Sequence, residues 1–133
     1  MSERNIHNAI CQYLRLQYPA VHFKTDLSGA YLGHGNYKTK GDKASTTSHP
    51  GFPDIIIYEL STIGNESYCG LALELKATSP YTKNNILKSN QHLIEQNQWL
   101  THLSSIGFKA HFSTGIDETM QLIDEYLNQS TNT

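Results

Sequence analysis

The Gly-Phe-Pro-Asp stretch at 51–54 and the Glu-Leu-Lys stretch at 74–76 decide the fold of this chain. Asp54 and Glu74 each lie ten residues from Gly64, so an antiparallel hairpin centred on that glycine places them directly opposite each other. Facing residues in such a pair have Cβ atoms about 5 Å apart on one face of the sheet. The spacing therefore predicts a hairpin that brings two carboxylates together.

Two facing carboxylates repel each other unless a cation or a shared proton compensates. A hard divalent cation with oxygen ligands is the natural compensation, and Mg²⁺ in particular needs few protein carboxylates. Lys76 lies two residues beyond Glu74 and points to the same face of the strand. Asp54, Glu74 and Lys76 together indicate a site that cleaves phosphodiesters. The alternative is a turn-capping Asp54 beside a solvated strand face.

Length and composition favour one domain spanning residues 1–133. The chain is 38% hydrophobic, and it contains neither an apolar run that could span a membrane nor a secretory leader, so we expect a cytoplasmic protein. Cys11 and Cys69 form no CxxC motif, and two cysteines make no disulfide framework. We expect both to be buried thiols.

Charge is distributed unevenly although the net charge is only −2. Lysines outnumber acids in residues 24–49 and 76–109, whereas residues from 110 onward carry acids and no Lys or Arg. This pattern favours a positive face that attracts nucleic acid. Scattered, solvated lysines are the alternative interpretation.

Hydrophobic periodicity and turn residues predict an α-β-β-β-α-β-α order. The expected elements are a helix capped by Ser2 and ended at Tyr18-Pro19, strands at 21–25, 54–60 and 68–77 with a turn at 61–67, a helix capped by Ser89 and running to Ser105, a strand at 108–114 and a helix at 117–128. Between the first two strands, residues 28–51 form a long Gly- and Lys-rich segment that we expect to be a flexible loop. A loop of that length in a small domain is usually functional or disordered.

Basic and aromatic residues in and beyond that loop suit contact with nucleic acid. Lysines bind phosphates, and aromatic rings such as those of Tyr31 and Tyr37 stack on bases. The expected DNA-binding lysines are Lys38, Lys40, Lys43, Lys83 and Lys88.

These residues and their order resemble the PD-(D/E)xK nuclease superfamily, and within it the virus-type replication-repair (VRR-NUC) nuclease domains. The stretches at 51–54 and 74–76 match the family's Gly-x-Pro-Asp and Glu-x-Lys elements, and Glu-Gln-Asn-Gln-Trp-Leu at 95–100 matches its Gln-bearing helix. Glu3 matches an acidic residue of the family's first helix. The resemblance implies a restriction-endonuclease-like α/β fold, with an αβββαβ core and a mixed sheet flanked by helices.

The site follows from the residues and the resemblance together. Asp54, Glu74 and the backbone carbonyl of Leu75 are the expected Mg²⁺ ligands, with Mn²⁺ as a substitute, and Glu3 is a further candidate whose alternative is a favourable helix N-terminal charge. Lys76 is expected to position water and stabilise phosphate charge. Gln96 interrupts an apolar stripe, so it serves the site or bonds to backbone in the core, whereas Gln98 falls off the stripe.

The expected function is a metal-dependent DNA endonuclease that is selective for branched DNA. The resemblance implies a Holliday-junction resolvase or flap-type enzyme of replication, recombination or repair, acting as a homodimer in a bacterial or phage-infected cell. Two alternatives stay open: a module of the same fold that binds DNA junctions or ends without cutting, and a nuclease that acts on RNA.

Overall fold

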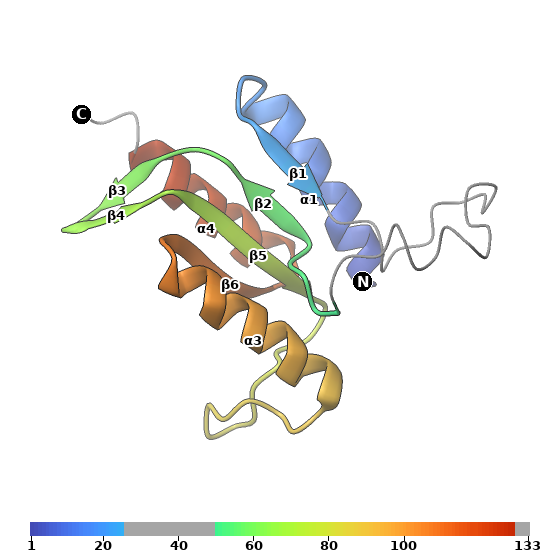
Figure 1. Cartoon of the computed structure of the whole chain (residues 1–133). Helices are drawn as coiled ribbons and strands as arrows, with labels where there is room; N and C mark the ends of the chain where they lie inside the picture. The colour runs from blue at the N-terminus through green and yellow to red at the C-terminus, as the bar shows by residue number, and fades with distance from the viewer. Residues whose placement is uncertain (26–49, 130–133) are drawn as a thin grey trace, which may run out of the picture.

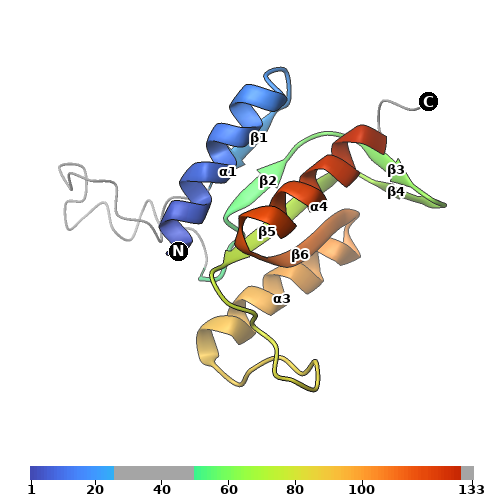
Figure 2. The ribbon, with the colours of Figure 1, turned by 180° about the vertical axis from the view of Figure 1, so that it is seen from behind.

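A four-stranded mixed sheet in the order β1-β2-β5-β6 lies between two layers of helices, with α1 and α4 on one face and α3 on the other (Figures 1 and 2). The computed structural model describes residues 1–25 and 50–129. This α/β arrangement confirms the predicted fold class. The elements are α1 (Glu3–Gln17), β1 (Phe23–Thr25), β2 (Ile55–Ile57), β3 (Ser61–Ile63), β4 (Glu66–Tyr68), β5 (Gly70–Lys76), α3 (Gln91–Ser105), β6 (Phe108–Thr114) and α4 (Gly115–Gln129).

The pairing of β2 with β5 has the predicted register. Ile55 pairs with Leu73 in antiparallel fashion, and one further step along this register places Asp54 opposite Glu74. β6 then pairs with β5 in parallel, as the intervening helix α3 requires. The two carboxylates therefore meet at one end of the central strands.

The tip of the hairpin differs from the prediction. Residues 61–67 are not a turn, because β3 and β4 form a two-stranded sheet of their own with Ser61 paired to Tyr68. The turn is confined to Gly64 and its neighbour Asn65, and Gly64 has a φ of +62°, which suits glycine. Of the expected strand at 54–60, only Ile55–Ile57 forms a strand, β2, and β3 begins beyond it in a different sheet.

The face toward α1 and α4 holds the larger core. Leu71, Leu73 and Leu75 point to it from β5 and pack against Ile10 of α1 and Tyr126 of α4. Such burial of apolar side chains is the main stabilising contribution in a domain of this size. The predicted alternation of β5 is thus confirmed, with its leucines on one face.

Two tyrosines join α1 to α4 at the far end of this core. Tyr13 and Tyr18 each donate a hydroxyl hydrogen bond of 2.6 Å to Oδ1 of Asp124. These bonds help to fix the orientation of α1 against α4. The N-terminal turn of α1 consequently has a defined place beside the end of the sheet (Figure 1).

Helix α3 covers the opposite face of the sheet. Its Leu103 packs with Ile56 and Ala72, and its Leu93 and Leu100 pack with Phe112. The helix begins one residue later than predicted, because Asn90 is the N-cap in place of Ser89 and accepts hydrogen bonds from the next backbone N–H groups. This helix seals the face on which Glu74 and Lys76 lie.

The two cysteines were both predicted to be buried thiols. Cys11 is buried as expected, but Cys69 is exposed, because it lies at the offset between the hairpin tip and β5. Within residues 1–25 and 50–129, no helix has both the length and the apolar character needed to cross a membrane.

Candidate active site

Asp54 is held at the end of the central strands by the backbone of β5. Its Oδ2 accepts a 2.8 Å hydrogen bond from the backbone N–H of Leu75. Pro53 before it is buried, so the turn that presents the carboxylate is anchored in the protein. Leu75 is also the residue whose carbonyl was predicted to bind metal, and its backbone N–H lies beside the Asp54 side chain.

Glu74 is almost entirely removed from solvent, with 3% of its surface exposed. Its Oε2 accepts a 2.9 Å hydrogen bond from Nε2 of Gln96, which reaches across from α3. Its Oε1 has no hydrogen-bond donor among the described residues. A buried carboxylate oxygen without a donor is costly, so this atom marks a place for a proton or a cation.

The two carboxylates cannot both carry their charge in the absence of a cation. Burial first, and then the charge and hydrogen bond of Asp54, raise the pKa of Glu74 to about 10, while Lys76 opposes the rise. Burial also raises the pKa of Asp54, against hydrogen bonds from Glu74 and Leu75 that favour its charged form. In the metal-free protein Glu74 therefore holds the shared proton, and Asp54 accepts it in a hydrogen bond.

Gln96 is buried and Gln98 is exposed, as the apolar stripe of the helix predicted. Nε2 of Gln96 lies 3.0 Å from Nε2 of His92, one turn earlier on α3. Because the amide nitrogen only donates, the imidazole nitrogen is the acceptor here. Sequence reasoning missed His92, although its position four residues before Gln96 is a usable signal.

A second histidine that the sequence analysis missed is His7 on α1. Its side chain is buried, and its Nε2 has no hydrogen-bond partner among the described residues. Burial raises the pKa of Asp54 and His7 opposes that rise, so His7 lies close enough to act on the site. Its place four residues after Glu3, on the same side of the helix, was the available signal.

A groove of about 270 Å³ opens at the Lys76 side of the site, and neither Asp54 nor Glu74 is among its lining residues. Lys76 lines the groove with 7% of its surface exposed, together with Lys88, His92 and Glu3. Glu3 is exposed at the start of α1, and its charge raises the pKa of both Asp54 and Glu74. The structure thus brings all five predicted site side chains, Glu3, Asp54, Glu74, Lys76 and Gln96, to one place.

The predicted DNA-binding lysines divide into three groups. Lys88 lines the groove next to Lys76. Lys83 is exposed on the connection before α3 and does not line the groove. Lys38, Lys40 and Lys43, with Tyr31 and Tyr37, lie outside the described residues.

The donor set fits a small, hard cation that keeps most of its own water. Within the described ranges, no three His, Cys, Asp or Glu side chains are grouped closely enough to hold a metal ion. Two carboxylates and one backbone carbonyl are a sparse set of the kind that Mg²⁺ accepts, because it usually retains several waters. The unsatisfied Oε1 of Glu74 and the raised pKa of both acids are what a site built for a cation would show without one.

Comparison with known proteins identifies the fold. The sequence matches no protein-family model and no curated protein. A solved structure described as a VRR_NUC domain protein superposes with a TM-score of 0.59 and 18% sequence identity, over 97% of this chain and 90% of the other. The chain therefore has a VRR-NUC-like fold, in which the predicted Asp54, Glu74 and Lys76 lie at one end of the central strands.

Proposed function

We propose that this protein is a metal-dependent DNA endonuclease of the PD-(D/E)xK superfamily, of the VRR-NUC type. The observation that carries the proposal is the pairing of Asp54 with the buried Glu74 beside the ammonium-bearing Lys76, at the edge of an open groove. Buried facing acids destabilise a protein at neutral pH unless a cation or a shared proton compensates them, so a purely structural role is a poor explanation. The VRR-NUC-like fold supports the same activity.

Each residue of the site has its own role in the proposed hydrolysis. Asp54, Glu74 and the Leu75 carbonyl would hold Mg²⁺ or Mn²⁺, which supplies an electrophile and lowers the pKa of a bound water. Lys76 binds a phosphate oxygen and stabilises the charge that develops on it. Gln96 fixes the orientation of Glu74 through its 2.9 Å hydrogen bond, and His92 fixes Gln96.

The proposed substrate is branched DNA, such as a four-way junction or a flap, cut to leave a 5′-phosphate. Lys76 and Lys88 place positive charge in the groove, which suits backbone contacts that read shape more than sequence. A homodimer with two-fold symmetry would present two such sites to one junction.

Cleavage of labelled four-way junction, flap, single-stranded and duplex DNA with Mg²⁺, Mn²⁺ or EDTA tests the proposal, with an RNA copy as a further substrate. Wild type is compared with Asp54→Ala and Lys76→Ala, and with Lys83→Ala as a lysine outside the groove. We expect metal-dependent cutting that both site variants lose and that the control retains. Binding without cutting under either metal would instead support a non-cleaving DNA module.

A further inference from the structure

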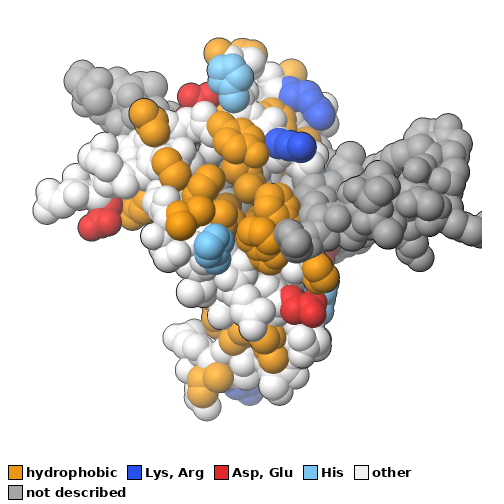
Figure 3. Space-filling model, in the orientation of Figure 1, with side chains coloured by type: hydrophobic (Ala, Val, Ile, Leu, Met, Phe, Trp, Pro, Cys, Tyr) orange, Lys and Arg blue, Asp and Glu red, His pale blue; other side chains and the backbone are white. Residues whose placement is uncertain are grey.

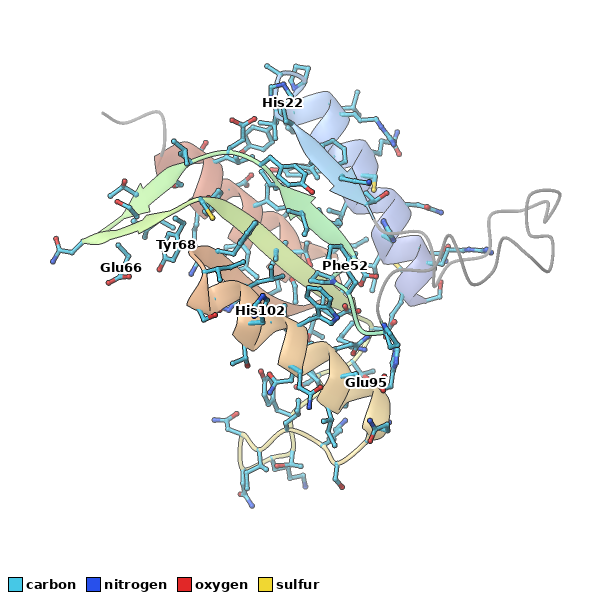
Figure 4. All side chains as sticks on the ribbon, viewed as in Figure 1. His22, Phe52, Glu66, Tyr68, Glu95 and His102 are labelled. Carbon is cyan, nitrogen blue, oxygen red and sulfur yellow. The ribbon has the colours of Figure 1, made fainter. Side chains whose placement is uncertain are left out.

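A second, smaller pocket lies beside α3, and it shares no lining residue with the groove. Its volume is about 200 Å³, and it is lined by Pro50, Glu95, Gln98, Trp99 and His102. Pockets that enclose drug-sized ligands measure about 300–1,000 Å³, so this one suits a single flat ring system. Figure 4 shows Phe52, Glu95 and His102 on the same face of the molecule, and Figure 3 shows apolar side chains gathered over the middle of that face.

The pocket has an aromatic wall that is held in place. Trp99 is half-buried and packs edge-to-face against Phe52, with ring centroids 5.0 Å apart. His102 lies against the same indole in another edge-to-face contact, at 6.2 Å. Aromatic surfaces supported in this way are the platforms on which proteins stack unpaired bases.

Polar groups at the rim favour a base over a phosphate. Glu95 is the one Asp, Glu, Lys or Arg side chain among the described lining residues, and a carboxylate repels a phosphate. The same carboxylate accepts hydrogen bonds from an exocyclic amino group, as acidic side chains do with cytosine. Gln98 adds an amide that both donates and accepts.

The pocket is next to the active site. Gln96, which bonds to Glu74, lies between Glu95 and Gln98 on α3, and Trp99 follows it by about 4.5 Å along the helix axis. Pro50 precedes Asp54 by four residues on the segment that enters β2. Because Gly51 has no Cβ atom, this segment approaches the backbone of Glu95 closely.

We propose that this pocket binds one unpaired nucleobase of the DNA, on a nucleotide adjacent to the phosphate that is cut. The inference rests on the proposed nuclease function, and it adds a requirement for a single-stranded or distorted position in the substrate. A fully paired duplex leaves the pocket empty, whereas a junction or flap offers a base that can leave the stack.

The fluorescence of Trp99 reports directly on this pocket, because it is the single tryptophan of the chain. The protein is titrated in EDTA with three ligands: an oligodeoxycytidylate, an abasic strand of equal length and a blunt duplex. Comparing them separates the contribution of the bases to binding from that of the sugar-phosphate backbone. We expect the oligodeoxycytidylate to quench Trp99 and to bind about 5- to 150-fold more tightly than the abasic strand. Equal quenching and affinity for both strands would overturn the proposal.

Two amides on one helix provide a matched test that leaves Trp99 intact. Gln98→Ala removes a rim group, whereas Asn97→Ala removes an exposed amide that lies outside this pocket. We expect Gln98→Ala to weaken binding of the oligodeoxycytidylate about 2- to 10-fold and Asn97→Ala to leave it unchanged. Identical affinities for the two variants would count against the pocket.

The outcome is independent of catalysis, because EDTA prevents metal-dependent cutting. DNA cleavage with no response of Trp99 to unpaired bases would leave the nuclease function standing and remove the base pocket. Quenching that depends on bases, in a protein that never cuts DNA, would retain the pocket and remove the nuclease function.

Discussion

The side-chain amide of Gln96 crosses from α3 to β5 and donates to Oε2 of Glu74 at 2.9 Å. The bond joins two layers of the domain at the site itself, since Glu74 lies opposite Asp54 on the central strands. It leaves Oε1 of Glu74 without a donor among the described residues. The helix therefore sets the orientation of one acid and leaves its other oxygen available to a cation.

Gln96→Ala should lower both cleavage and affinity for Mg²⁺ by about 10- to 100-fold, which is typical when a partner of a metal-binding carboxylate is removed. The measurement is the rate of DNA cleavage as a function of Mg²⁺ concentration. Asn97→Ala, an exposed amide on the same helix, is the control and should behave as wild type. A normal Mg²⁺ dependence in Gln96→Ala would show that Glu74 needs no support from α3.

The meeting of Asp54 with Glu74 was predictable because it depends on strand register, and register follows from spacing about a turn. The leucines of β5 set the buried face by simple alternation, which also assigned Glu74 and Lys76 to the other face. Gln96 was found because a polar residue interrupted an apolar helical stripe.

What the sequence did not reveal depends on how separate elements pack. His7 reaches the site only because α1 is docked against α4 and the sheet, and its spacing from Glu3 indicates a shared side of the helix but not the docking angle. The pocket beside Trp99 likewise forms where α3 meets the segment entering β2. The predicted turn at 61–67 was wrong because β3 and β4 form a short hairpin there. Apolar and polar residues alternate only weakly in that hairpin, so its sequence resembles a loop.

The buried acids should make the metal-free protein less stable as the pH rises. The folded-state pKa of Glu74, about 10, lies far above its ordinary value of 4.5. The folded state thus binds the proton more tightly, and the resulting stability is complete below about pH 4.5, declines as the pH rises above it and is lost beyond the folded-state pKa. Thermal unfolding in EDTA across this window measures the effect.

Glu74→Gln removes the titration and should stabilise the metal-free protein by roughly 1–3 kcal/mol near pH 8, because folding then no longer requires a carboxylate to take up a proton. The same variant should lose cleavage. Added Mg²⁺ should raise the melting temperature of wild type, and more at pH 8 than at acid pH, because it competes with the shared proton. Parallel pH profiles for wild type and Glu74→Gln would contradict the assignment.

Lys88 and Lys83 provide a test of where the DNA backbone lies. Lys88 lines the groove with Lys76, so Lys88→Ala should weaken binding to all DNA sequences. It should also reduce the salt slope, which is the slope of log affinity against log salt concentration, by the amount that corresponds to about one phosphate contact. Lys83→Ala should change the slope much less, since Lys83 lies outside the groove. Binding measured in EDTA over a range of salt concentrations distinguishes them, and equal slopes would place the DNA elsewhere.

Gly51 fixes the distance between the segment that carries Asp54 and the helix that carries Gln96. Its φ is +87°, and a Cβ atom there would lie 2.7 Å from the backbone carbonyl carbon of Glu95, where neither atom can move cheaply. Gly64 also has a positive φ, but a Cβ there would have no neighbour within 4 Å among the described residues. Substitutions at these two glycines therefore distinguish the cost of backbone strain alone, at Gly64, from the cost of strain plus a steric collision, at Gly51.

Gly64→Ala should cost about 1–2 kcal/mol from the left-handed conformation alone. Gly51→Ala should cost more, by a further 1–3 kcal/mol or so, because the collision displaces the entry segment from α3. Denaturant unfolding gives both free energies, and cleavage should fall only in Gly51→Ala, since only that change moves Asp54 relative to Gln96. Equal destabilisation of the two variants, with full activity in both, would mean that this contact does not position the acid.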